Sequence, residues 1–225
     1  MFRIIPRARR PDGPHLAHRR RPALRIASLG LIGFGLLAAC TRHTEPERFL
    51  TARGIAAPTE DRFTVCHGYD CTYRTAVSLT AEEWNRITAP LATAAPDATT
   101  ERTQIAMTIA QFETIVGVKT GTSGDRGRLR FLAAGDATQL DCIDETTNTT
   151  TYLLLLQSRG KLRWHRAGRP AKRGVFIDGR WYHETAVLVE TASGAEFAID
   201  SWFEDNGMPP HILPLDDWSL SWNYS

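Results

Sequence analysis

Three residues in the second half of the chain, Cys142, His183 and Asp200, have side chains suited to thiol catalysis. In such catalysis a thiol attacks an acyl carbon, an imidazole takes and returns the proton, and a carboxylate orients the imidazole. Their order allows a helix to carry the cysteine and two later strands to carry the histidine and the aspartate. A Cys-His-Asp triad is therefore the leading hypothesis for the chemistry of this chain.

The other three cysteines have separate explanations, which leaves Cys142 unpaired. Cys40 ends the apolar run Leu37-Ala38-Ala39-Cys40, the form of a bacterial lipoprotein processing site, so we expect Cys40 to be lipidated. Cys66 and Cys71 are five residues apart and are expected to form a small disulfide loop in an oxidising compartment. A metal site that uses both and His67 is the alternative, although this set is incomplete for zinc.

Cys142 is predicted to begin a helix that runs to about Arg159. The partial positive charge at a helix start favours a thiolate, and backbone N–H groups there could bind the oxyanion of a tetrahedral intermediate. Gln139 is a candidate side-chain donor to the same oxyanion. Asp141 and Asp144 act against a thiolate, so an inert buried thiol is the alternative for Cys142.

The composition of this helix indicates burial on most sides. Residues 145–151 contain five threonines and have poor helix propensity, whereas residues 152–156 are strongly apolar. We expect the threonines to serve as small residues under close packing.

His183 and Asp200 fall in two strand-like segments, Tyr182–Thr191 and Ala195–Trp202, which a turn near Ser193-Gly194 joins into a hairpin. A turn centred between 193 and 194 places residue 204 opposite His183, about four residues beyond Asp200. A bulge or a wider turn would close part of that gap. His165, in a further strand over 161–166, is a rival base.

The preceding segments predict an α+β domain. Residues 62–79 alternate as one or two strands around the cysteine pair, and a capping box at residues 80–83 opens a helix. A second helix is expected from about 99 to 118 and a short strand at 129–132. The apolar positions of the second helix recur every three or four residues and form a core-facing stripe: Ile105, Ile109, Phe112 and Val116.

Residues 1–39 have the features of a lipoprotein signal peptide. Their uncharged run, residues 26–39, is shorter than the ~20 residues that span a bilayer. An uncleaved membrane anchor, or a start codon further downstream, is the alternative. Residues 40–61 are polar and are expected to be a tether, and residues 62–225 a single domain. The lack of Asp at the second mature position is typical of outer-membrane rather than inner-membrane lipoproteins, on the periplasmic side of the envelope.

Removing residues 1–39 changes the sign of the charge. These residues contain eight of the 27 basic residues and one of the 25 acidic ones, which leaves 19 and 24. A mildly acidic chain does not attract phosphate backbones, so we expect no nucleic-acid partner.

Three stretches resemble the bacterial transglutaminase-like cysteine proteinases. The stretch 141–145 (DCIDE) is similar to their D-C-x-D motif, 181–189 (WYHETAVLV) to their histidine strand and 197–200 (FAID) to their aspartate strand. The resemblance covers roughly residues 101–205 and departs at the threonine run. It implies a papain-like fold, a core helix on an antiparallel sheet, with Cys142 as nucleophile and His183 and Asp200 as base and orienter. Some relatives bind calcium near the cysteine, which makes Asp136, Asp141 and Asp144 weak calcium candidates; no other cofactor is expected.

The leading function is an envelope thiol hydrolase or acyl transferase that acts on peptide or isopeptide bonds of a protein or peptide substrate. The alternative is a catalytically inactive, lipid-anchored binding or assembly protein on the same scaffold.

Overall fold

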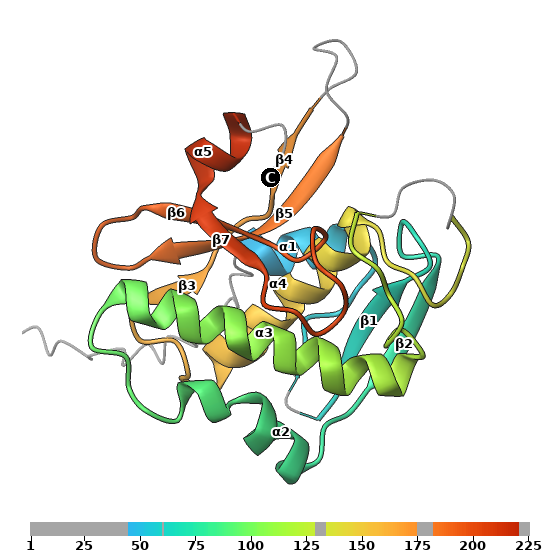
Figure 1. The fold of residues 1–225 in the computed structure, drawn as a ribbon, viewed down its shortest axis with the longest axis horizontal. Helices are drawn as coiled ribbons and strands as arrows, with labels where there is room; N and C mark the ends of the chain where they lie inside the picture. The colour runs from blue at the N-terminus through green and yellow to red at the C-terminus, as the bar shows by residue number, and fades with distance from the viewer. Residues whose placement is uncertain (1–44, 60, 129–133, 175–181, 221–225) are drawn as a thin grey trace, which may run out of the picture. The chain divides into compact units, whose positions relative to one another are not determined.

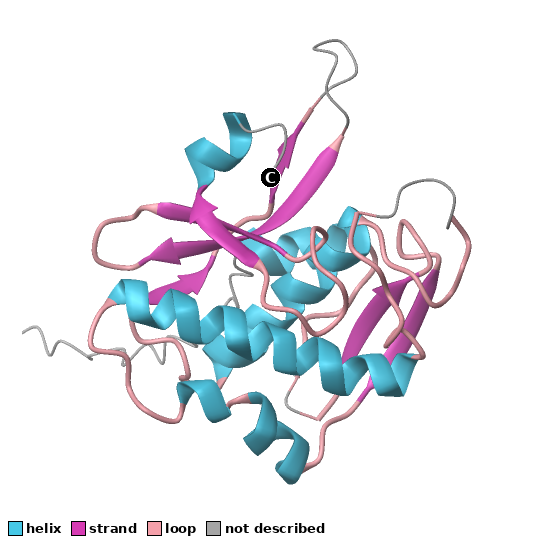
Figure 2. Cartoon of the chain, in the orientation of Figure 1, coloured by secondary structure: helices cyan, strands magenta, loops and turns pink. Residues whose placement is uncertain are grey.

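The computed structural model describes residues 45–59, 61–128, 134–174 and 182–220, which form a mixed α+β fold with antiparallel sheets (Figure 1). Helix α1 (Glu45–Ala52) precedes a two-stranded sheet of β1 (Phe63–His67) and β2 (Tyr73–Val77). Helices α2 (Ala81–Ile87) and α3 (Ala98–Thr120) follow, separated by the 3-10 helix η1 (Ala89–Leu91). Figure 2 shows the strands in two groups, with helix α4 (Cys142–Ser158) between them.

Helix α4 forms the centre of the core, in contact with both sheets. All of its residues from Asp144 to Leu156 are buried, so the expected burial on most sides is confirmed. Three of the buried threonines satisfy their hydroxyls within the helix: those of Thr147, Thr150 and Thr151 each donate to the carbonyl four residues earlier. Because a buried hydroxyl without a partner is unfavourable, this back-bonding lets the run pack tightly despite its weak propensity.

Helix α3 buries the predicted stripe, including Ile105, Ile109 and Phe112, and the predicted bounds are within two residues of the observed ones. The phenyl ring of Phe112 stacks on Tyr152 of α4, with ring centroids 4.4 Å apart. The expected capping box at the start of α2 is present: Thr80 and Glu83 exchange side-chain to backbone hydrogen bonds.

The larger sheet carries the two strands of the proposed site. Strand β5 (His183–Glu190) pairs with β6 (Glu196–Asp200), which pairs with β7 (His211–Pro214). On the other edge of β5, β3 (His165–Ala167) and β4 (Ala171–Arg173) pair with its two ends. Every pairing is antiparallel. Helix α5 (Leu215–Leu220) follows β7 directly.

Part of the expected tether is folded. Residues 45–52 form α1, whose Leu50 is fully buried, and Arg53 directly after it is hydrogen-bonded to β5. The expected signal peptide, the lipidation site at Cys40 and the short strand at 129–132 lie outside the described residues. Within the described part of the chain, no helix combines the length and apolar character that crossing a membrane requires.

Candidate functional site

Cys142 is the first residue of α4, as expected. Asp141 caps the helix: its carboxylate accepts hydrogen bonds from the N–H groups of Ile143 and Asp144. Among the described cysteines, Cys142 alone is outside a disulfide, and its side chain is partly exposed. The sulfur is therefore not bridged, and the residue as a whole is not fully buried.

The resting form of Cys142 is the thiol. Burial, with smaller contributions from the carboxylates of Asp141, Asp200 and Glu184, raises the pKa of Cys142 to about 12, against the lowering effect of the Glu184 backbone. Among the described residues, no hydrogen bond joins this thiol to the His183 ring. The helix start therefore does not by itself produce a thiolate, because burial of the sulfur, aided by the nearby carboxylates, favours the neutral thiol.

His183 and Asp200 meet on one face of the β5–β6 hairpin. Nε2 of His183 lies 2.7 Å from a carboxylate oxygen of Asp200, and both side chains are buried. The observed register pairs Ala186 with Ile199, so Asp200 continues opposite Thr185, two residues from His183. Diagonal neighbours at this spacing share a sheet face, which explains the contact.

Three aromatic side chains enclose the imidazole of His183. Its ring centroid lies 4.9 Å from that of Trp202, 5.5 Å from that of Phe203 and 5.8 Å from that of Trp218. The indole N–H of Trp218 also donates to the same Asp200 oxygen, at 2.6 Å. The His183–Asp200 pair is thus shielded from water, which strengthens its electrostatic interaction.

A cluster of charged side chains surrounds the buried carboxylate of Glu184, the residue after His183. The Glu184 carboxylate is fully buried and accepts from Arg53 at 2.9 and 2.6 Å and from Lys172 at 2.9 Å. The Tyr182 hydroxyl also donates to this carboxylate. This cluster borders the proposed site, since the Glu184 backbone and carboxylate both affect the pKa of the Cys142 thiol.

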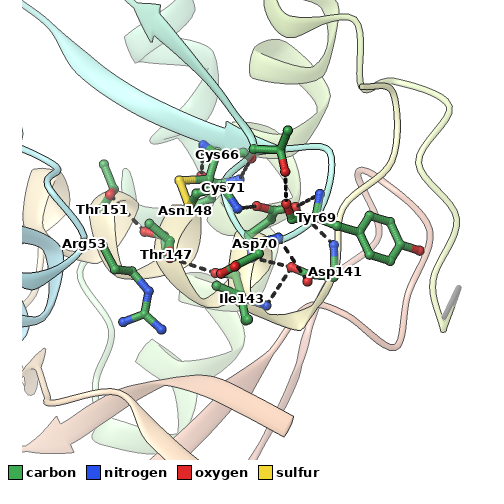
Figure 3. Close-up of a disulfide and its surroundings, with 12 residues drawn as sticks. Arg53, Cys66, Tyr69, Asp70, Cys71, Asp141, Ile143, Thr147, Asn148 and Thr151 are labelled. Carbon is green, nitrogen blue, oxygen red and sulfur yellow. Dashed lines mark hydrogen bonds between the residues drawn. A yellow bond between two sulfur atoms is a disulfide. The ribbon is translucent and has the colours of Figure 1, made fainter. Parts of the chain in front are cut away.

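The expected Cys66–Cys71 disulfide is present and closes a loop against the start of α4 (Figure 3). Residues Tyr69, Asp70 and Cys71 all have left-handed backbones, with φ of 72°, 51° and 51°. Three successive non-glycine residues in this conformation are strained, and such loops turn their N–H groups to one side.

The carboxylates that flank Cys142 occupy this concave loop. Asp144 accepts from the N–H groups of Tyr69 and Cys71 at 2.8 and 2.7 Å, and Asp141 accepts from that of Asp70 at 3.1 Å. Even so, burial and the neighbouring Asp141 raise the pKa of Asp144 to about 7. Two of the three candidate calcium ligands, Asp141 and Asp144, therefore already serve as acceptors for backbone N–H groups.

Two further predicted residues are engaged locally. Gln139 is buried, with its amide nitrogen donating to the carbonyl of Gly124 and its amide oxygen accepting from the N–H of Arg126. Asp136 is exposed and accepts from the backbone and hydroxyl of Thr138. The roles of Gln139 as an oxyanion donor and of Asp136 as a calcium ligand stay predictions.

His165 has both ring nitrogens occupied. Nδ1 lies 2.7 Å from the Glu101 carboxylate and Nε2 3.2 Å from the Arg102 guanidinium. Glu101 also accepts the N–H groups of Arg163 and Trp164, so the group fixes the loop before β3. This environment favours a structural histidine over the rival base.

A group of buried acidic residues comes from α3, from α4 and from the loop that joins them. Burial raises the pKa of Glu113 to about 8 and that of Asp125 to about 7, and it raises the pKa of Glu145 well above its ordinary range. One carboxylate oxygen of Glu113 has no hydrogen-bond partner. In the described parts of the chain, the one cluster compact enough to hold a metal is Cys66, Cys71 and Asp144, whose two sulfurs form the disulfide.

No protein-family model, curated protein or solved structure matches this chain. Sequence reasoning missed two members of the site, the Glu184 cluster and the Trp218 donor. The sequence signal for Glu184 was an acidic residue in a segment that otherwise reads as an apolar strand. The residues around Trp218 give no indication that its indole N–H donates to Asp200.

Proposed function

We propose that the protein is a thiol hydrolase or acyl transferase that uses Cys142 as nucleophile, His183 as base and Asp200 as orienting carboxylate. The buried 2.7 Å contact between His183 and Asp200, on a strand that packs against the helix of Cys142, is the observation that supports this proposal most. The central helix on an antiparallel sheet is also compatible with the papain-like fold that the resemblance implies.

The raised pKa of Cys142 determines the form of the mechanism. The thiol attacks the acyl carbon while Nδ1 of His183 takes its proton, and Asp200 stabilises the imidazolium through Nε2. The backbone N–H of Cys142 stabilises the oxyanion. The imidazolium then returns the proton to the leaving amine, which gives a thioester that water or an acceptor amine resolves.

The second candidate function is an inactive binding or assembly protein on the same scaffold. The protonated resting thiol favours it, because thiol enzymes commonly lower the pKa of the nucleophile. In either case we propose a lipoprotein that is anchored through Cys40 on the periplasmic side of the envelope and acts on, or binds, a protein or peptide.

Acyl transfer to Cys142 distinguishes the two candidates. The full chain is incubated with p-nitrophenyl acetate, and acetylation is followed by mass spectrometry on the peptide that contains Cys142. For a catalytic thiol we expect His183→Gln to slow acetylation by about 100-fold or more, the usual contribution of a general base. Asp200→Asn should slow it in the same direction.

His165→Gln is the matched control, since it changes a buried imidazole that has its own carboxylate partner. Its acetylation rate should stay close to that of the wild type. Equal rates in the wild type and His183→Gln would contradict the enzyme proposal and favour the binding protein. Cys142→Ser supplies the blank for the peptide assay.

A further inference from the structure

We propose that Trp218 is a positioning residue for the Cys142–His183–Asp200 site: its indole N–H holds the Asp200 carboxylate in the orientation that accepts from His183. The inference rests on the proposed function and extends it to a residue outside the stretch that resembles a known family. This role is supported by one shared acceptor atom, by the burial of Trp218 and by the contacts that fix Trp218 itself.

The shared acceptor is one oxygen of Asp200. It lies 2.7 Å from Nε2 of His183 and 2.6 Å from Nε1 of Trp218, so two N–H donors converge on it. A carboxylate with a single donor can rotate about its side-chain torsions, whereas a second directed donor removes that freedom. The Trp218 side chain is fully buried, so water does not replace the indole donor.

Trp218 is held in turn from the strand beside His183. The Arg173 guanidinium lies over the indole, 4.3 Å from the ring centroid, and donates to the backbone carbonyl of Trp218. Arg173 of β4 is the register partner of His183 on β5. His183 therefore contacts Asp200, Asp200 contacts Trp218, and Trp218 contacts Arg173. Arg173 in turn pairs with His183 across β4 and β5.

The indole ring also contributes packing against the imidazole, so a test must separate the N–H from the ring. Trp218→Phe removes the N–H and keeps an aromatic ring. Trp164→Phe is the matched control, because the indole N–H of Trp164 donates to the carbonyl of Ala95 at 3.0 Å, away from the Asp200 carboxylate. Thermal unfolding of each variant establishes that it is folded.

The readout is the ring N–H of His183 in ¹⁵N-labelled full chain, assigned by its loss in His183→Gln. We expect the Nε2–H proton to exchange with solvent about tenfold faster in Trp218→Phe. This is the change in an equilibrium that the loss of one hydrogen bond typically produces. We also expect a larger fraction of the Nδ1–H tautomer. Trp164→Phe should leave both quantities at their wild-type values, as expected for a change that only affects packing elsewhere.

Unchanged or slower exchange in folded Trp218→Phe would overturn the positioning role. If that variant does not fold, Arg173→Gln provides the test, since it loosens Trp218 without removing the N–H; no acceleration there overturns the proposal as well. The proposed enzyme function is judged separately by acetylation of Cys142. Faster exchange in Trp218→Phe, together with equal acetylation in the wild type and His183→Gln, would leave Trp218 as an organiser of an inactive site.

Discussion

The free energy of unfolding of the protein should fall as the pH rises, and replacing Glu113 by Gln should make this fall much smaller. Glu113 is buried on α3, accepts one hydrogen bond from the N–H of Gly207 and leaves its other oxygen without a partner. Burial, with a further contribution from Asp125, raises its pKa from 4.5 to about 8. The folded protein therefore keeps this proton at pH values where the unfolded chain releases it.

The direction and size of the effect follow from proton linkage. Because the folded state binds more protons between pH 4.5 and about 8, the free energy of unfolding falls as the pH rises through this window. Each unit of pKa difference corresponds to about 1.4 kcal/mol, so Glu113 alone accounts for a loss of roughly 4–5 kcal/mol across the window. Asp125 and Glu145 have raised pKa values and act in the same direction.

Urea unfolding at half-unit steps from pH 4.5 to 8.5 measures the effect. The difference in free energy of unfolding between Glu113→Gln and the wild type should shift in favour of the variant by about 1.4 kcal/mol per pH unit between about pH 5 and 8. Glu82→Gln, the same change at an exposed position of α2, controls for the general effect of replacing a carboxylate by an amide. A difference that is constant with pH would refute the reasoning, whatever its absolute size.

Three substitutions test the contacts around the site by urea unfolding at constant pH. Arg53→Met should lower the free energy of unfolding by about 3 kcal/mol, because it removes a partner of the buried Glu184; a change below about 1 kcal/mol would contradict this. Asn148→Leu should cost about 2–4 kcal/mol, since the buried N–H and carbonyl of Cys66 both lose their partner; a neutral result would argue that water replaces the amide. Joint replacement of Cys66 and Cys71 by Ser should lower the free energy of unfolding by about 2 kcal/mol, the entropic contribution expected of a disulfide that closes a loop of about six residues. The wild type should lose the same amount of stability when it is unfolded in the presence of a reducing agent.

The sequence predicts best where the signal is periodic and local. The stripe on α3, the capping box of α2 and the bounds of α4 all follow from repeats or caps a few residues long, and each is present. The β5–β6 hairpin is present too, but its register differs from the predicted one by two. Glu190 and Ala195 close the turn, so its centre lies one residue earlier than the predicted centre at 193–194.

The remaining features depend on contacts that are distant in sequence. Helix α1 lies in a polar segment without periodicity and is held by Arg53, whose partner is 131 residues away. Strand β7 and helix α5 form after residue 200, where the sequence has no periodic pattern, and they bury Trp218 against Asp200. The protonation of Cys142 reverses a prediction made from the helix start, because burial and surrounding carboxylates act only in the folded chain.

The loop closed by Cys66 and Cys71 has a consequence for how this sequence can change in evolution. The N–H groups of its left-handed residues 69–71 donate to the carboxylates of Asp141 and Asp144. Loss of the carboxylates would leave a strained backbone without hydrogen-bond acceptors, and loss of the loop would leave buried carboxylates without donors. Substitutions at 141 or 144 should therefore be inherited together with glycine or asparagine replacements, or deletions, within 69–71. Any lineage that keeps both acids should keep the paired sulfurs as well.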